Sequence, residues 1–553
     1  MKQQERNANS DRRRTILALL LGLAMATAAA AQPGSSPASP NSSSPQNPSS
    51  ESNPAKPPSE NQAAKPATHI TPEQAQQLFA LVDELLKFSS QDTGLPVKGT
   101  VKRQMTTRAA VESYLTEKFN EDEGAKRLQR DEIVLKKFGL LDRDFELKPF
   151  LLALLKEQIE AYYDSKTKTV NLLDWVDPDE QKPVMAHELT HALQDQHSDL
   201  EKWDDQTPND VSTTAAEDVD HLARDEMDTA RDAVAEGQAT AVMFDYVLKP
   251  MGKSLVKDPE VLDIVKSQMN SSADSPVMSR APLLLSESLL FPYKEGLSFE
   301  QDVWMDQGQN AAFAAMLDRP PTSSWEIINP RVYEQKRIPA VPLLPDIHPL
   351  VDPLYRPYDI GQIGELDVHI ITELFGGDAS ASDLTPAWDG GLYWAGQLRS
   401  ASTPAELTST RSLAIFYLSV WKNADSAMTF AKMYANNLGR KYSSVHQVSA
   451  GAAAAESGAE QVYSTDEGPV LITTRGKMVF VAESFPLPLA HKLTTLILDS
   501  QGTGATRMTA APRPVPPLSQ PAMQPLSAGL VHFFENCGVM KSAVDAVVRA
   551  AGR

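Results

Sequence analysis

Apolar side chains recur with helical spacing along most of the chain from residue 71 onward. In residues 71–90 they fall three and four positions apart, behind a threonine and a proline, which is the pattern of a capped amphipathic helix. A long acidic segment, residues 215–246, predicts another helix with one break. The same spacing predicts further helices over residues 108–120, 127–138, 150–159 and 183–196.

Strand-like patterns are shorter and fall into two regions. Residues 97–105 form one such run, and residues 160–173 predict a β-hairpin with its turn over 164–168. Residues 360–500 mix both patterns, with helices over 365–374 and 426–434 and strands over 412–421, 460–464, 469–474 and 478–484. The fold class predicted is therefore α+β. A mainly helical domain with a small sheet (68–345) precedes a smaller α+β domain of unknown role (360–500).

The two ends of the chain have different compositions. Three arginines precede an apolar run over residues 16–31, which predicts a secretory signal peptide (1–31) cleaved near Ala31. Because this run is borderline in length for a membrane span, an uncleaved N-terminal anchor is the alternative. Residues 32–67 are rich in proline and serine and predict a disordered linker, and residues 501–553 a Pro-rich tail with a short terminal helix. We expect an exported protein, periplasmic or secreted, and the linker is compatible with a loose association with the cell envelope.

Length, charge and cysteine usage exclude several classes of protein. The chain has 553 residues, more than one hydrophobic core supports, so two or more domains are expected. Its net charge of −20 repels nucleic acid, so no nucleic-acid partner is expected. Cys537 is the single cysteine, which excludes an intrachain disulfide and a cysteine-based zinc site. Any bound metal must therefore be held by His, Asp or Glu.

The segment HELTH, residues 187–191, contains the candidate metal ligands and proton acceptor. On a helix, His187 and His191 lie one turn apart on the same face, so both imidazoles can reach one Zn²⁺. Glu188 lies beside them, where a carboxylate can accept a proton from water activated by the metal. The flanking residues are apolar, and a buried helix that carries three such groups needs a partner for them.

A catalytic zinc needs a third protein ligand. His197 lies six residues after His191, which turns it away from the ligand face, so we expect it at the helix end. Glu236 is the better candidate, because its neighbours are small and allow a second helix to pack closely on the first. The alternatives are His221 or one of the nearby acids Glu217, Asp218, Asp220, Asp225 and Glu226.

HELTH followed by AVAEGQAT (233–240) resembles gluzincin-type zinc metallopeptidases, which implies that the mainly helical domain 68–345 is a zincin-like catalytic domain. With the segments 159–173, 291–296 and 320–324, the chain is similar to a group of poorly characterised bacterial metallopeptidases over about residues 95–340, and more loosely at 388–391. The resemblance implies that His187, His191 and Glu236 bind zinc, that Glu188 is the general base, and that the hairpin supplies an edge strand for an extended peptide.

Two parts of the family's site stay unassigned. Thr240 stands where some gluzincins carry an Asp that orients a ligand His. Tyr162, Tyr163, Tyr246 and Tyr293 are candidates for the group that stabilises the oxyanion.

The function predicted is that of an exported, zinc-dependent metallopeptidase acting on a peptide or protein substrate. One alternative is a non-catalytic, envelope-associated binding or scaffold protein whose metal site is structural or degenerate. Another is a zinc hydrolase of a different amide or ester. Glu188 argues against the scaffold, because a structural zinc site does not need that carboxylate. Substrate preference, oligomeric state and regulation by a pro-segment such as residues 68–100 are left open.

Overall fold

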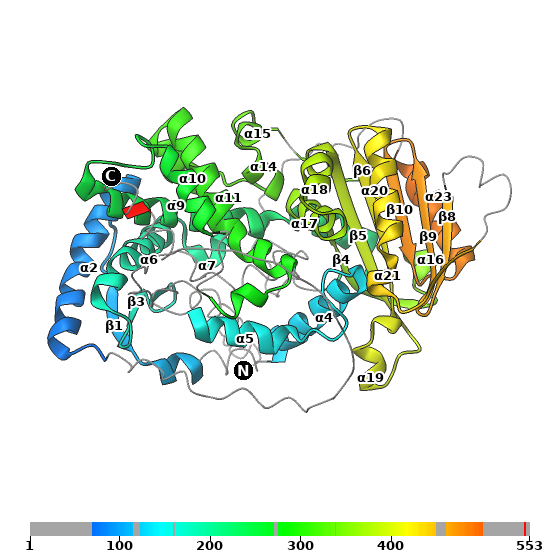
Figure 1. Ribbon diagram of the computed structural model, residues 1–553, viewed down its shortest axis with the longest axis horizontal. Coiled ribbons are helices and arrows are strands. Elements are labelled where there is room, and N and C mark those ends of the chain that lie inside the picture. The colour runs from blue at the N-terminus through cyan, green and yellow to red at the C-terminus, as the bar shows by residue number, and fades with distance from the viewer. Residues whose placement is uncertain are drawn as a thin grey trace, which may run out of the picture.

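The computed structural model describes residues 69–113, 122–158, 161–204, 206, 208, 211–269, 275–337, 339–448, 460–501 and 547–548. The predicted signal peptide and linker lie outside these residues, as do Cys537 and nearly all of the predicted tail. The fold is α+β, as predicted, with a helical half (residues 69–337) and a sheet half (residues 339–501) side by side (Figure 1). In the part of the chain that is described, no helix is long and apolar enough to cross a membrane.

The helical half is built around a bundle of long helices, and the bounds of several of them differ from the predicted bounds. The acidic helix does break, between α8 (Ala215–Arg224) and α9 (Met227–Leu248). The helix predicted over 183–196 begins earlier, at Pro178, because Asp177 caps it and the proline occupies its first turn. The elements are α2 (Pro72–Thr93), α4 (Asp122–Phe138), α5 (Leu147–Gln158), α6 (Pro178–Ser198), α7 (Leu200–Trp203), α8 (Ala215–Arg224), α9 (Met227–Leu248), α10 (Glu260–Met269), α11 (Leu283–Gln307), α12 (Gln309–Ala312), α13 (Ala314–Asp318), α14 (Ser324–Ile328) and α15 (Pro330–Glu334).

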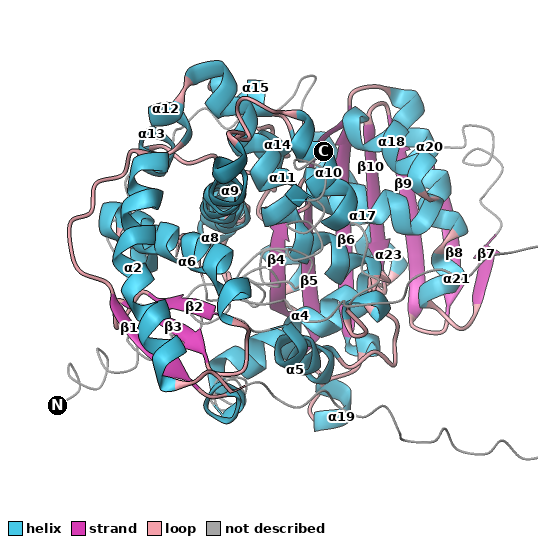
Figure 2. Ribbon diagram, turned by 60° about the vertical axis from the view of Figure 1, so that its left-hand side comes forward, coloured by secondary structure: helices cyan, strands magenta, loops and turns pink. Residues whose placement is uncertain are grey.

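A three-stranded sheet lies beside α6 in the helical half (Figure 2). Its strands are β1 (Lys102–Thr106), β2 (Ala161–Asp164) and β3 (Thr169–Leu173), in the order β1-β3-β2. The predicted hairpin is confirmed: β2 and β3 pair antiparallel, and Lys168 closes the turn with a φ of 55°. β1 pairs parallel with β3 and starts later than the predicted strand over 97–105. This order leaves β2 at the edge.

Helices α9 and α11 touch backbone to backbone. A side chain at Gly237 would collide with the carbonyl group of Gly296, and one at Gly296 would collide with the carbonyl group of Ala233. Glycine is therefore required at both positions by the approach of the two helices rather than by backbone conformation. Helix α11 was not predicted from the sequence, because Pro292 and Gly296 fall in its middle.

The sheet half is one antiparallel sheet of seven strands with helices on both faces (Figure 2). Alternate residues of each strand face opposite layers. Tyr393 and Ile415 pack with α17 (Glu365–Gly376) and α20 (Ala424–Asn436), whereas Trp394 and Phe416 pack with α23 (Leu487–Ser500). The strand order is β4-β5-β6-β10-β9-β8-β7. The elements are α16 (His348–Val351), β4 (Tyr355–Gln362), α17 (Glu365–Gly376), α18 (Asp378–Leu384), β5 (Trp388–Leu398), α19 (Pro404–Leu407), β6 (Leu413–Trp421), α20 (Ala424–Asn436), α21 (Leu438–Lys441), β7 (Val445–Val448), β8 (Glu460–Thr465), β9 (Gly468–Arg475), β10 (Met478–Glu483) and α23 (Leu487–Ser500).

The boundary of the sheet half differs from the predicted one. β4 begins at Tyr355, upstream of residue 360, inside the Pro-rich segment 320–357. The same Pro-rich segment also contains the short helices α14, α15 and α16. Short helices tolerate proline in their first turn, which is where Pro330 and Pro349 lie in α15 and α16.

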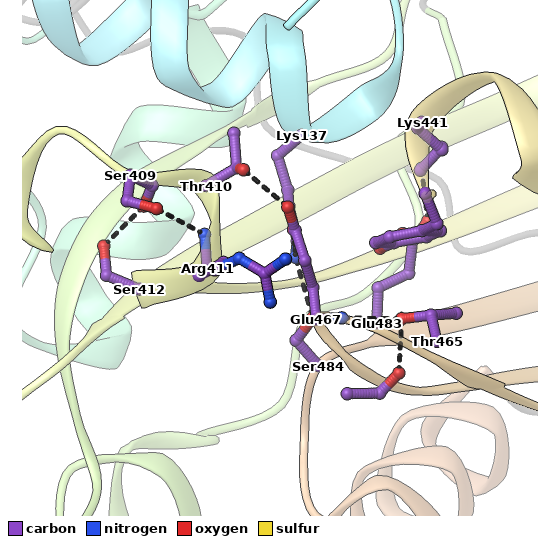
Figure 3. A network of polar contacts seen from close by, with 12 residues as sticks. Lys137, Ser409, Thr410, Arg411, Ser412, Lys441, Thr465, Glu467, Glu483 and Ser484 are labelled. Carbon is purple, nitrogen blue, oxygen red and sulfur yellow. Dashed lines mark hydrogen bonds and ion pairs between the residues drawn. The ribbon is translucent and has the colours of Figure 1, made fainter. Parts of the chain in front are cut away.

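Helix α4 joins the two halves through a buried polar network (Figure 3). Lys137 at its end is fully buried and lies 2.9 Å from Glu467 and 2.7 Å from the hydroxyl of Ser484. A second buried pair, Lys441 and Glu483, lies 2.7 Å apart beside it. One cluster of buried apolar residues continues from the helical half into the sheet half. The two predicted domains thus share a core in this structure.

Candidate metal centre

Helix α6 places the HELTH segment in the interior of the helical half. It contacts α2, α9 and β2, so apolar residues such as Met185, Leu189 and Leu193 are buried on several of its faces. The exposed fractions of His187, Glu188 and His191 are 4%, 0% and 1%. Their burial means that the three polar groups must find partners inside the protein.

Glu236 of α9 faces the two histidines. Its Oε2 lies 3.1 Å from Nε2 of His187, and its Oε1 lies 3.7 Å from Nε2 of His191. The two Nε2 atoms are 3.0 Å apart. Among the described residues, these three form the one group of His, Cys, Asp or Glu side chains close enough to hold a metal ion. The structure thus brings together the three ligands predicted from the sequence.

The three side chains fit a tetrahedral metal in type and spacing. Ligand atoms about 2.0–2.1 Å from a tetrahedral Zn²⁺ lie about 3.3 Å from one another. The two Nε2 atoms, 3.0 Å apart, and the 3.1 Å between Nε2 of His187 and Oε2 of Glu236 are close to that value, and one ligand atom from each residue lies within 4.8 Å of the others. Two imidazoles and a carboxylate are also a donor set that suits Zn²⁺. The residues present therefore fit a zinc ion.

A pair of glutamine side chains orients His191. The Nε2 of Gln194 donates to the backbone oxygen of Ala235 (3.0 Å) and to Oε1 of Gln238 (2.9 Å), so its Oε1 must face His191. That oxygen lies 2.8 Å from Nδ1 of His191, which therefore carries the proton. The lone pair of His191 is then left on Nε2, toward Glu236. Gln238 is held in turn by the backbone oxygen of Ala312, 2.7 Å away.

Tyr293 of α11 lies on the other side of the site. Its ring stacks on the His187 ring, with centroids 6.4 Å apart, and its hydroxyl interacts with the Glu236 carboxylate. Of the four tyrosines considered for the oxyanion, Tyr293 is the one in contact with predicted ligands. Tyr162 lies beside Thr106, Tyr163 donates to Asp195, and Tyr246 packs edge-on against Phe88.

Glu188 points from α6 toward the edge strand. Its Oε2 accepts a hydrogen bond of 2.7 Å from the backbone N–H of Tyr163 in β2. Its Oε1 has no hydrogen-bond partner within the described residues. The carboxylate is therefore held at one oxygen, which leaves the other available to a water molecule or a substrate.

Burial governs the protonation of the four side chains. It lowers the pKa of His187, with a further contribution from the charge of His191, and it lowers the pKa of His191 to about 3. Both imidazoles are therefore neutral near pH 7, the form that binds metals. Burial also raises the pKa of Glu188, followed by the charge of Glu236, and raises the pKa of Glu236, followed by the charge of Asp232. A cation between the ligands would offset that cost for the two carboxylates.

The other candidates from the sequence lie elsewhere. His221 is 3.0 Å from the backbone oxygen of Pro208, and His197 is 3.0 Å from Asp318 near the end of α6. Neither belongs to the metal group. The remaining histidines of the described chain mostly face acids: His69–Asp174, His348–Asp218, His369–Glu373 and His491–Glu460.

Sequence reasoning missed the residues that support the ligands. Gln194 and Gln238 have no signal of their own in the sequence, although Gln194 stands three residues after His191, a spacing that places both on one helix face. No protein-family model, curated protein or solved structure matches the chain. The argument for function therefore rests on the residues of this site.

Proposed function

We propose that the protein is a zinc-dependent metallopeptidase whose active site consists of His187, His191, Glu236 and Glu188. The observation that carries the proposal is the convergence of two neutral imidazoles and a carboxylate, 3.0–3.7 Å apart, beside a second buried carboxylate. A structural zinc site would need the first three groups but has no use for Glu188.

The chain's own residues divide the work of peptide hydrolysis. A zinc ion bound by His187, His191 and Glu236 supplies Lewis acidity, which makes water more acidic and the scissile carbonyl more electrophilic. Glu188 takes a proton from the attacking water while the oxygen of that water bonds to the carbonyl carbon. Glu188 then gives that proton to the amine nitrogen as the C–N bond breaks. The second proton of the water stays on the new carboxyl group, so the products are a carboxylic acid and an amine, which exchange this proton to become a carboxylate and an ammonium group.

Other residues hold this arrangement in place. Gln194 and Gln238 fix the orientation and tautomer of His191, which keeps its Nε2 directed at the metal position. Tyr293 contacts both His187 and Glu236, so its hydroxyl is the group that we assign to stabilising negative charge on the carbonyl oxygen. The resemblance also predicts that β2 binds an extended peptide, although the Tyr163 amide on the unpaired side of β2 already donates to Glu188.

One observation favours the second candidate, a non-catalytic protein with a closed metal site. The three residues of the metal group are at most 4% exposed, which is typical of structural sites. A zinc hydrolase of another amide or ester would use the same residues as a peptidase. Export through the N-terminal segment also stays a prediction, as does the resemblance to gluzincins.

Hydrolysis of casein by the full chain distinguishes the proposed peptidase from the non-catalytic protein. Wild type is compared with Glu188→Gln and with Asp179→Asn, which alters an exposed carboxylate on the same helix. We expect hydrolysis by wild type and Asp179→Asn, and a loss of at least about 100-fold in Glu188→Gln with its zinc retained. Zinc bound by a wild-type protein that hydrolyses neither peptides nor other amides and esters would favour the structural site.

A further inference from the structure

Tyr163 bridges two acidic residues of α6. Its backbone N–H donates to Glu188 over 2.7 Å, and its hydroxyl donates to Oδ2 of Asp195 over 2.8 Å. Glu188 and Asp195 are seven residues apart, two helical turns, so they lie on the same side of α6. One residue of the edge strand is thus attached to the helix at two points.

The surroundings of Asp195 hold its carboxylate in place for the contact with Tyr163. Its side chain is fully buried, and its Oδ2 also receives Lys168 from the hairpin turn at 2.7 Å. Its Oδ1 accepts from the backbone N–H of Leu200 over 3.3 Å. Three donors satisfy this carboxylate, two of them from the β2–β3 hairpin. Asp195 therefore joins the hairpin to the helix that carries both histidines.

The backbone geometry of β2 links this contact to Glu188. Tyr163 lies opposite Val170 in the antiparallel pair, and its N–H points to Glu188 rather than to β3. In an antiparallel strand the N–H and C=O of a residue point to the same side. The unpaired edge of β2 therefore faces Glu188, and a small movement of the strand changes the only hydrogen bond that holds that carboxylate within the described residues.

We propose that Asp195 is a positioning residue for Glu188, and that it acts through the Tyr163 hydroxyl and backbone. Asp195 keeps β2 against α6, so that the Tyr163 amide holds Oε2 of Glu188 and leaves Oε1 to act as the base. This inference rests on the proposed hydrolytic function. It adds Asp195, Tyr163 and Lys168, none of which binds the metal, to the residues on which turnover depends.

The test removes one hydroxyl group from the full chain. Tyr163→Phe keeps the ring and the backbone N–H but loses the bond to Asp195. Tyr333→Phe is the matched control, because that buried tyrosine also donates one bond of 2.8 Å, to the backbone oxygen of Arg319, far from Glu188 in the chain. Both are made in wild type and in Glu188→Gln, and zinc content, kcat, KM and amide hydrogen exchange over residues 161–164 are measured.

We expect Tyr163→Phe to retain zinc, to lower kcat between about 10-fold and 100-fold with little change in KM, and to speed exchange of the Tyr163 amide. In the Glu188→Gln background it should lower the remaining kcat no further, because a residue that acts through Glu188 has nothing left to position. Tyr333→Phe should change none of these quantities.

Two results overturn the inference. Equal losses of kcat from Tyr163→Phe with and without Glu188 would show a general structural role, and unchanged amide exchange would show that Asp195 does not hold β2. The exchange measurement needs no substrate. If wild type proves inactive, the proposed function fails, while faster exchange in the zinc-loaded Tyr163→Phe variant would still support the link from Asp195 to β2.

Discussion

Replacing Gly296 with alanine tests how the site is built, because the added methyl group has no room. Its Cβ would lie well under 3.0 Å from the carbonyl oxygen of Ala233, and it would also contact the carbonyl carbon and Cα of that residue at 3.0 and 3.2 Å. These are backbone atoms, which cannot rotate away as a side chain can. Helices α9 and α11 must therefore separate, by a distance on the order of 1 Å.

Two opposing effects determine how much the Gly296→Ala substitution changes the free energy of unfolding. Alanine is favoured over glycine inside a helix by about 1 kcal/mol. Overpacking costs about 1–3 kcal/mol, and contact with rigid backbone places this site at the upper end. The net loss of stability is therefore about 2 kcal/mol. Because Tyr293 lies one turn before Gly296 and contacts both His187 and Glu236, the same movement should weaken zinc binding.

Urea unfolding followed by circular dichroism measures the first effect, and chelator competition measures the second. Gly439→Ala in α21 is the matched control, because a Cβ there meets nothing within 4 Å. It should be neutral or stabilising by up to about 1 kcal/mol. A Gly296→Ala protein as stable as Gly439→Ala, with unchanged zinc affinity, would refute the account of this helix contact.

Three further predictions concern single polar groups. Gln194→Leu removes the acceptor for Nδ1 of His191 and should weaken zinc binding about 10–100-fold in chelator competition; unchanged affinity would contradict the assigned tautomer. Burial, followed by the charge of Asp367, raises the pKa of Glu226 from 4.5 to about 8. The contribution of Glu226 to the free energy of unfolding is therefore present below pH 4.5 and is lost as the pH rises toward 8. Melting temperatures from pH 5 to 9 should fall less in Glu226→Gln than in wild type, and parallel curves would count against a buried, protonated Glu226. Lys441→Met leaves the buried Glu483 without its nearest cation and should cost about 3–5 kcal/mol in urea unfolding; a loss below about 1 kcal/mol would show that the network in Figure 3 is not strongly coupled.

The sequence was most informative where local spacing determines geometry. His187 and His191 could be placed on one helix face from their separation alone, and the β2–β3 hairpin followed from its turn. Glu236 was identified because small neighbours allow a close helix contact; α9 does contact α6, but Gly237 faces α11. In each case the prediction depends on a few neighbouring residues of the sequence.

Tertiary contacts explain what could not be predicted. Pro292 and Gly296 argued against a helix, yet α11 runs through both because burial against α9 outweighs their poor propensity. Strand β5 was missed because Gly390, Gly391 and Gly396 indicate turns, whereas here they make room for neighbouring side chains and backbone. The roles of Gln194 and Asp195 depend on α9 and β2, which no local pattern brings to α6.

The zinc content of the purified full chain tests the central claim most directly. Elemental analysis would compare wild type with His187→Ala, Glu236→Ala and Glu188→Gln. The account predicts about one zinc per chain in wild type and in Glu188→Gln, and its loss in the other two. Zinc retained by both ligand variants, or no zinc in wild type after supplementation, would contradict a metal centre formed by His187, His191 and Glu236.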